Sequence, residues 1–431
     1  MRYYSLKNPT ITTDFKTAVI NGIAPDRGLY FPNEIPRLAP SFFDQIETMD
    51  VHQMAVEIMT PFVSGEIPKD ILEQIIKKTL DFDFPIVPLA PNIGILELFQ
   101  GPTLAFKDVG ARFMAQCLGY FNHEENNQEI TVLVATSGDT GGAVANGFLG
   151  VKGIKVVILY PKGKVSDVQE RQLTTLGENI TALEVDGVFD DCQEMVKNAF
   201  LDSEINSKRK LTSANSINIA RWLPQMLYYF IAYKKLKKQN KTLVFSVPSG
   251  NFGNICAGMI AQQMGVPIDH FIASTNVNDT VPAYLESKEY SPKPTVPTIS
   301  NAMDVSDPSN FVRIQKIYEN NFSLLSNHLS AYRFTDIETR AAIESIYVDS
   351  GYIADPHGAV GYLGLKKYLE KNPEKYGLFL ETAHPVKFLD TVESSLNIKV
   401  PVPERIKVLF TKEKQRISIS DYTDLKAYLL T

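Results

Sequence analysis

The sequence predicts an α/β protein with two open, mostly parallel sheets covered by helices, preceded by a mainly helical N-terminal unit. From about residue 90 onward, short apolar runs rich in β-branched residues alternate with longer helical segments. Strands without polar alternation are typical of parallel sheets that are buried on both faces and joined by helical crossovers. Before residue 86, helical periodicity and turn residues dominate instead.

The N-terminal unit is expected to span residues 1–85. Asp14 is placed to cap a first helix and Gly22 to end it. A longer helical pattern follows, and we expect breaks near Pro61 and Pro68 because proline lacks the backbone N–H that a helix interior requires.

Four apolar runs are predicted to be buried strands, and each is bounded by turn or helical residues. They occupy residues 130–135, 155–160, 242–247 and 270–274. The predicted α/β domains are residues 86–235 and residues 236–431, with the chain allowed to cross between them.

Composition narrows the class of protein. The chain has 431 residues, 44% of them hydrophobic, and its 43 Lys and Arg against 49 Asp and Glu give a formal net charge of −6. The three cysteines have no metal-binding spacing, and neither a signal peptide nor a long apolar run is evident. We therefore expect a cytoplasmic protein, a monomer or homodimer, with no metal and no nucleic-acid or membrane partner.

A turn rich in glycine and asparagine follows the strand predicted at 242–247. Gly250 and Gly253 let the backbone approach a ligand closely, and the next helix offers free N–H groups and the positive end of its dipole. These features favour a phosphate, although an ordinary strand-to-helix turn has the same composition. The turn is neither a Walker A loop nor a GxGxxG fingerprint.

A second polar turn, residues 136–142, follows the strand predicted at 130–135. Its hydroxyls and amides suit a carboxylate or a phosphate, and a plain helix cap by Ser137 or Thr140 is the alternative. Before it, Lys107 lies in a largely apolar stretch. Burial there would lower the pKa of the amine and allow it to form a Schiff base, whereas a surface lysine paired with a carboxylate is the alternative.

Polar groups also recur between residues 215 and 221. Asn215, Asn218 and Arg221 are spaced three apart, which predicts one helix face with Arg221 as a forked donor for an anion. A helix cap followed by a surface arginine is the alternative. No histidine lies in a metal-binding motif, and no GxSxG elbow occurs.

Taken in order, these segments resemble the threonine synthase family of pyridoxal-phosphate enzymes, which have the type II, tryptophan-synthase-β-like fold. The resemblance covers nearly the whole chain. Its segments are residues 22–30, 101–110, 136–142, 215–221, 250–254, 298–305, 355–357 and 382–385. Each motif alone is weak, but the ordered set is specific.

The resemblance implies a role for each segment. Lys107 matches the lysine that forms the Schiff base with pyridoxal 5'-phosphate and then acts as a base, and Thr382 matches the hydroxyl that meets the pyridine nitrogen. The cofactor-phosphate loop corresponds to Gly250, Asn251, Phe252, Gly253 and Asn254. The loop for the substrate carboxylate corresponds to Thr136, Ser137, Gly138, Asp139 and Thr140, and the site for the substrate phosphate resembles Asn215, Ser216 and Arg221.

The implied reaction converts O-phospho-L-homoserine and water to L-threonine and phosphate, by γ-elimination and β-hydration, as the last step of threonine biosynthesis. Two alternatives remain open. One is another type II enzyme such as a serine/threonine dehydratase, whose reaction needs neither the phosphate cluster nor the N-terminal unit. The other is a non-catalytic phospho-amino-acid binding relative, against which Lys107 and the complete phosphate loop argue.

Two positions depart from the family pattern. Arg27 stands where a glycine is usual. Asp139 stands where related type II enzymes often have an asparagine near the 3-oxygen of the cofactor. Because two anionic oxygens would repel, we expect Asp139 either to be protonated or to point away from that oxygen.

Overall fold

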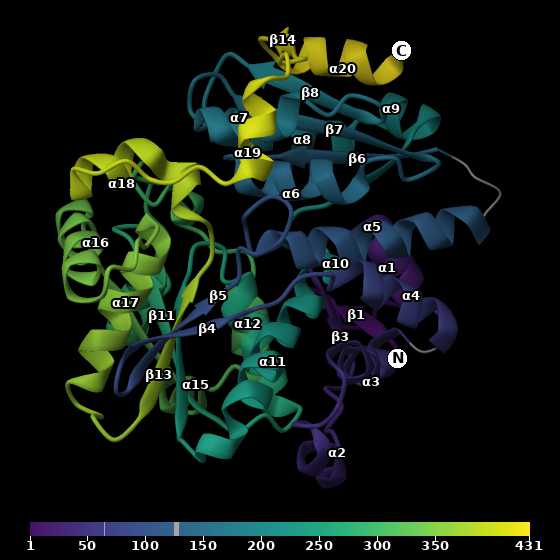
Figure 1. The fold of residues 1–431 in the computed structure, drawn as a ribbon. Coiled ribbons are helices and arrows are strands. Elements are labelled where there is room, and N and C mark those ends of the chain that lie inside the picture. The colour runs from purple at the N-terminus through teal and green to yellow at the C-terminus, as the bar shows by residue number, and fades with distance from the viewer. Residues whose placement is uncertain (64, 125–128) are drawn as a thin grey trace.

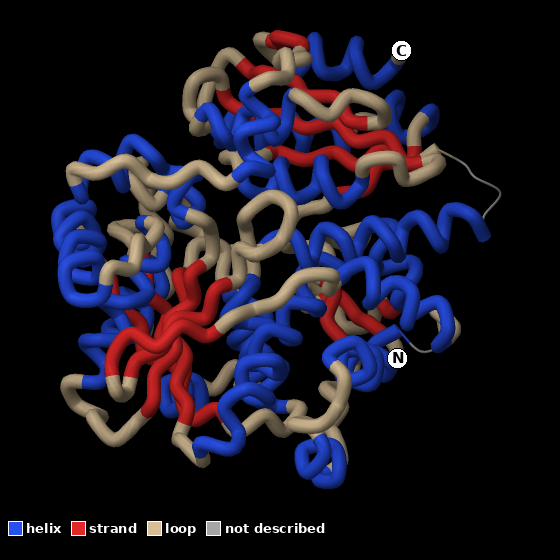
Figure 2. Tube along the Cα trace, in the orientation of Figure 1, coloured by secondary structure: helices blue, strands red, loops and turns tan. Residues whose placement is uncertain are grey.

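Two open sheets covered by helices form the body of the molecule, and a smaller unit built from the N-terminus packs beside them (Figures 1 and 2). The computed structural model describes residues 1–63, 65–124 and 129–431. Apart from one antiparallel pair, the strands of both large sheets run parallel, as the continuous apolar runs predicted. The predicted fold class is confirmed.

The larger sheet has six strands in the order β12-β11-β10-β13-β5-β4. Its strands are β4 (Ile86–Ala90), β5 (Ile93–Glu97), β10 (Leu243–Pro248), β11 (Ile268–Thr275), β12 (Leu329–Arg333) and β13 (Tyr376–Glu381). The helices associated with this half of the molecule are α11 (Leu227–Leu236), α12 (Gly253–Gln263), α13 (Thr280–Ser287), α14 (Phe311–Ile317), α15 (Phe322–His328), α16 (Asp336–Ser350), α17 (Pro356–Leu369) and α18 (Leu389–Leu396).

The smaller sheet has five parallel strands in the order β14-β8-β7-β6-β9. Its strands are β6 (Ile130–Ala135), β7 (Ile154–Pro161), β8 (Ile180–Val185), β9 (Lys210–Ser213) and β14 (Ile417–Ile419). The helices around it are α6 (Asp139–Phe148), α7 (Asp167–Thr174), α8 (Phe189–Leu201), α9 (Ser203–Lys208), α19 (Glu404–Phe410) and α20 (Tyr422–Leu430).

The N-terminal unit is largely helical but also contains a small antiparallel sheet that the sequence did not predict. Its elements are β1 (Tyr3–Ser5), β2 (Thr12–Thr13), α1 (Phe15–Asn21), β3 (Tyr30–Pro32), α2 (Pro40–Gln45), α3 (Val51–Val63) and α4 (Lys69–Thr79). Asp14 and Gly22 cap α1 as predicted. Pro68 precedes α4, and α3 ends at Val63, two residues after Pro61, so the pattern is broken near both prolines as predicted, although Pro61 itself lies inside α3.

Arg27, the departure from the usual glycine, adopts the left-handed conformation with φ of 66°. That conformation favours glycine, which explains the family preference at this turn. The carbonyl of Ala24 accepts a hydrogen bond from the Arg27 amide, and the Ala24 amide donates to the carbonyl of Gly28. The turn therefore forms despite the side chain at this position.

The sheets are built from different ranges than the predicted domains 86–235 and 236–431. Residues 86–97 add two strands to the larger sheet, and residues 417–419 add an edge strand to the smaller one. The chain therefore crosses between the sheets at both ends of the α/β region, and the C-terminal part lies over the smaller sheet (Figure 1).

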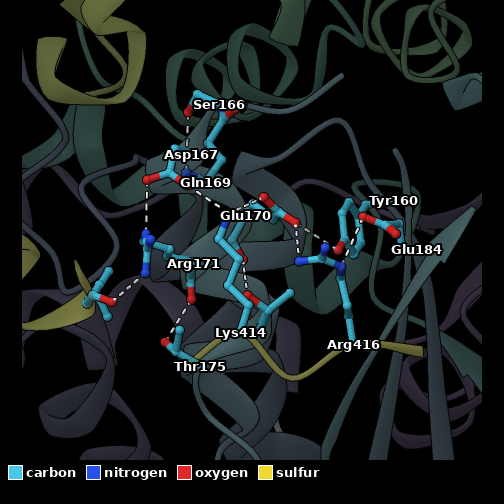
Figure 3. Close-up of polar contacts among 12 residues, drawn as sticks. Tyr160, Ser166, Asp167, Gln169, Glu170, Arg171, Thr175, Glu184, Lys414 and Arg416 are labelled. Carbon is cyan, nitrogen blue, oxygen red and sulfur yellow. Dashed lines mark hydrogen bonds and ion pairs between the residues drawn. The ribbon is translucent and has the colours of Figure 1, made fainter. Parts of the chain in front are cut away.

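Ion pairs attach this C-terminal segment to α7 (Figure 3). The Lys414 ammonium lies 2.7 Å from a carboxylate oxygen of Asp167 and 2.5 Å from one of Glu170. Arg416 pairs with Glu170 at 3.3 Å and with Glu184 of β8 at 3.1 Å. These ion pairs connect the C-terminal segment to α7, whose Gln169 donates to the carboxylate of Asp139 at the site described next.

No helix in the described part of the chain is long and apolar enough to cross a membrane.

Candidate active site

A cavity of about 590 Å³ lies at the carboxyl ends of β6, β10 and β13. Open parallel sheets bind ligands at this edge, because the loops that follow the strands form a crevice there. The residues lining it include Lys107, four residues of the 136–140 loop, the 250–254 loop and Thr382, together with Asn215, Ser216 and Arg221. Of the fifteen predicted site residues, only Gly138 does not line the cavity.

Lys107 is the first residue of α5 (Lys107–Glu124). The segment before it is anchored to the end of β13, because the Phe106 amide donates to the carbonyl of Thr382 at 2.9 Å. Burial lowers the pKa of Lys107 to about 8, outweighing the attraction of the nearby Asp139 carboxylate. No carboxylate of the described residues forms an ion pair with Lys107, so its amine is available for chemistry in the cavity.

The predicted phosphate loop has the geometry of an anion site. Phe252 adopts a left-handed conformation with φ of 58°, and α12 begins directly after it, so the first amides of the helix lie at the cavity. A Cβ atom on Gly250 would lie 2.7 Å from the Cα of Met303, so only glycine fits there. The Asn254 carbonyl oxygen Oδ1 accepts from the Tyr229 hydroxyl at 2.9 Å, while its Nδ2 is buried without a partner.

The loop predicted to hold a carboxylate is shaped by Thr136 rather than by the expected cap residues. The Thr136 hydroxyl accepts hydrogen bonds from the amides of Gly138 and Gly141 at 2.9 and 2.8 Å. Ser137 and Thr140 do not cap α6 and instead line the cavity. Gly138, with φ of 131°, packs against Gln169 and does not line the cavity.

Asp139 pairs with a buried lysine, which bears on the two expectations for this residue, a protonated carboxyl or one that points away from the 3-oxygen of the cofactor. Its Oδ1 lies 2.7 Å from the ammonium of Lys387, and both side chains are almost completely buried. The pKa of Asp139 is lowered because the opposite charges of Lys387 and Lys107 and two hydrogen bonds outweigh its burial. The ion pair favours an ionised carboxyl over a protonated one, and its partner Lys387 was not identified from the sequence.

Asn215 and Ser216 lie in a loop, and Arg221 lies in the short helix α10 (Ile219–Trp222). The predicted single helix face is wrong, because the helix begins only after Asn218, whose side chain caps it and donates to the carbonyl of Val19 at 2.9 Å. Asn215, Ser216 and Arg221 nevertheless meet at the cavity.

Arg221 is a buried cation without a carboxylate partner among the described residues. Its side chain is 2% exposed, one guanidinium nitrogen donates to the carbonyl of Ala214, and Nε has no partner. Burial lowers its pKa to about 10, so it remains charged at neutral pH. A buried charge with unused donors at a cavity indicates a site for an anion.

A second buried arginine, Arg313, supports this loop from behind and was not predicted. It donates to the carbonyls of Ile217 at 2.7 Å and Tyr30 at 2.9 Å, and to the Oδ1 of Asn310 at 2.6 Å. Its guanidinium also lies 4.3 Å from the ring of Trp222. Arg313 therefore ties the N-terminal unit to the loop that carries Asn215 and Ser216.

The two predicted phosphate sites lie next to each other. The side-chain amide of Asn251 donates to the Ser216 hydroxyl at 2.7 Å, and Asn310 donates to the carbonyl oxygen of Asn251 at 3.0 Å. The sequence placed Asn251 and Ser216 in separate motifs, and the structure joins them in one wall of the cavity.

Thr382 follows the end of β13, lines the cavity and is 6% exposed. Nearby, His357 also lines the cavity, and its Nε2 accepts from the Ala302 amide at 3.2 Å. Its Nδ1 contacts the carboxylate of Asp355, so these two contacts place a proton on Nδ1 and leave Nε2 as the acceptor. The Asp-Pro-His sequence was the only signal for this residue.

The cavity is lined by polar groups that lack partners within the protein. Unpartnered buried atoms occur on Asn215, Arg221, Gln225, Asn254 and Asn301, all of which line it. Buried polar groups are normally hydrogen-bonded, so this concentration indicates a polar ligand. With a helix N-terminus for a phosphate and a lysine of lowered pKa, the residues fit pyridoxal 5'-phosphate.

Comparison with known families supports the same assignment. The profile of pyridoxal-phosphate-dependent enzymes matches residues 93–379. The profiles of the threonine synthase N terminus and the threonine synthase C-terminal region match residues 2–80 and 358–429.

Relatives match over essentially the full length. The chain is 45% identical over 433 residues to threonine synthase of Buchnera aphidicola subsp. Baizongia pistaciae, covering all of both chains. The crystal structure of Escherichia coli threonine synthase superposes with a TM-score of 0.93 at 41% identity, covering 100% of this chain and 99% of that one. The PLP-bound threonine synthase of Brucella melitensis gives a TM-score of 0.93 at 34% identity and covers 100% and 98%.

Proposed function

Because the chain belongs to the threonine synthase family and is a pyridoxal-phosphate-dependent enzyme, we propose that it converts O-phospho-L-homoserine and water to L-threonine and phosphate in this cavity. The observation that supports the substrate assignment is the buried Arg221, which lines the cavity beside the phosphate loop with an unpartnered Nε and, with Asn215 and Ser216, would form a second anion site. One phosphate group belongs to the cofactor, and a phosphorylated substrate needs another site of this kind.

The loop at residues 250–254 would hold the phosphate of the cofactor at the N-terminus of α12. Thr382 would face the pyridine nitrogen, where a hydroxyl does not force protonation as a carboxylate would. When bound there, pyridoxal 5'-phosphate supplies the electron sink that makes proton removal from an amino acid possible.

The protein's own groups would orient the amino acid and move its protons. Ser137 and Thr140, with the first amides of α6, would receive the carboxylate, and Arg221 would receive the phosphate. These two contacts fix both ends of the substrate. The Nζ atom of Lys107, with its pKa lowered to about 8, would then accept and return a proton near neutral pH.

The available amine of Lys107 also supports catalysis over simple binding. A protein that only binds a phospho-amino acid needs no buried lysine of lowered pKa at the same cavity. The second anion site likewise favours a phosphorylated substrate over the hydroxyl substrate of a dehydratase.

The test is to incubate the purified protein with O-phospho-L-homoserine and to measure threonine and phosphate in parallel, with Lys107→Ala as the control. We expect equal amounts of the two products from the wild type and none from the variant. Formation of a keto acid and ammonia from serine or threonine, without threonine from the phosphorylated substrate, would identify a dehydratase instead.

A further inference from the structure

A buried ion pair borders the cavity beside Lys107. The Lys387 ammonium, on the short 3-10 helix η4 (Pro385–Phe388), lies 2.7 Å from Oδ1 of Asp139 and donates to the carbonyl of Thr103 at 3.0 Å. Lys387 is completely buried and Asp139 is 3% exposed. Buried charges of this kind must be balanced, because leaving one unpaired is costly.

The Asp139 carboxylate is held by a second donor on the same oxygen. The Ser166 amide donates to Oε1 of Gln169 at 3.1 Å, which leaves Nε2 of Gln169 to donate to Oδ1 of Asp139 at 2.9 Å. Figure 3 shows Gln169 on α7 and Ser166 just before this helix, next to the ion pairs that Lys414 makes with α7. Two donors therefore draw Asp139 toward α7 and η4.

Asp139, Lys387 and Arg221 are the charged groups that act on the amine of Lys107. They come from three different elements, α6, η4 and α10. Asp139 favours the protonated amine, while Lys387 and Arg221 disfavour it. The charge of Asp139 alone would therefore work against the neutral amine that the reaction needs.

We propose that Lys387 is a positioning residue that keeps Asp139 as a carboxylate drawn away from the cavity centre, so that the two together present no net charge to Lys107 and the cofactor ring. This proposal rests on the cofactor occupying the cavity beside Lys107, as proposed above.

The test compares the wild type with Lys387→Met, Asp139→Asn and the double variant as holoenzymes. The first readout is the pH at which the visible spectrum of the bound cofactor changes, which reports the proton near the Lys107 nitrogen. Lys387→Met removes a positive charge and should raise this pH, whereas Asp139→Asn removes a negative charge and should lower it. Each shift should correspond to about a tenfold change in proton affinity.

The second readout is retention of the cofactor during dialysis, followed by fluorescence, with circular dichroism as a check of folding. Each single variant leaves one buried charge unpaired and should lose cofactor roughly tenfold to a hundredfold faster. The double variant removes both charges and should retain cofactor within about threefold of the wild type, which independent effects would not produce.

The proposal would be overturned if the spectra of the two single variants did not shift, or shifted equally in the same direction. A double variant that loses cofactor faster than either single variant would also overturn it. If Lys387→Met does not fold but the double variant does, the result still supports charge pairing. If the double variant does not fold either, Lys387 is a packing residue and the proposal is refuted. The threonine assay of the wild type is separate, so a failure of the proposed substrate would not be mistaken for a failure of this pair.

Discussion

Replacing Arg221 by methionine tests the assignment of the second anion site. Methionine keeps much of the length and apolar volume of the side chain but removes its charge. In the structure the guanidinium has one carbonyl partner, Ala214, and an unpartnered Nε, and no described carboxylate pairs with it. An anion in the cavity would use these spare donors.

The expected loss follows from this geometry. A hydrogen bond to a charged group contributes about 1.5–3 kcal/mol, so losing the contact to the phosphate should reduce kcat/KM roughly tenfold to a hundredfold. Cofactor content should stay unchanged, because a different loop holds the phosphate of the cofactor. Arg221→Lys should recover only part of the loss, since lysine keeps the charge but not the fork.

The stability of Arg221→Met, in contrast to its activity, should not fall. Removing a buried cation that lacks a counter-charge relieves a desolvation cost, so the free energy of unfolding of Arg221→Met should be unchanged or higher. Arg313→Met is the matched control, because Arg313 is equally buried but its guanidinium donates to acceptors within the protein instead of keeping donors free for a ligand. Leaving those acceptors unpaired should lower the free energy of unfolding by about 3 kcal/mol or more.

The assay measures kcat/KM on O-phospho-L-homoserine, cofactor absorbance and urea unfolding for Arg221→Met, Arg221→Lys and Arg313→Met. An unchanged kcat/KM in Arg221→Met would remove this residue from the substrate site. A loss of stability as large as that of Arg313→Met would identify Arg221 as a structural arginine.

Three further predictions concern the cofactor. The rate at which cofactor-free protein captures pyridoxal 5'-phosphate should rise about tenfold per pH unit below the Lys107 pKa of about 8 and then level off, because only the neutral amine reacts. A capture rate that does not depend on pH between 6 and 9 would contradict this prediction. Borohydride should also fix the cofactor on the Lys107 peptide. Thr382→Val should keep the cofactor but change its visible spectrum and slow turnover, and if neither changes, Thr382 is only a hydroxyl at a strand end. Gly250→Ala should weaken cofactor retention by tenfold or more, because its Cβ would lie 2.7 Å from the Cα of Met303 in the neighbouring backbone; normal retention would show that the loop adapts.

The sequence by itself determined the local structure of this protein. The apolar runs became strands, residues 130–135 forming β6, and Asp14 and Gly22 bound α1. The glycine turn at residues 250–254 also leads into a helix, as its composition predicted. These features depend on neighbouring residues only, so they can be read from spacing and side-chain chemistry.

Local patterns failed where the tertiary context decided the outcome. Asn215, Asn218 and Arg221 have helical spacing, but Asn218 binds the carbonyl of Val19 in the N-terminal unit and the helix starts after it. There the surrounding structure outweighs the local preference.

Only the tertiary structure revealed how charge is balanced at the site. Nothing near Lys387 in the sequence indicates that it pairs with Asp139, because the two residues are far apart along the chain and meet only through the tertiary fold. Arg313 became visible for the same reason, through its contacts with Tyr30 and Ile217. Burial and charge pairing depend on everything that surrounds a group in space, whereas the sequence specifies only its neighbours along the chain.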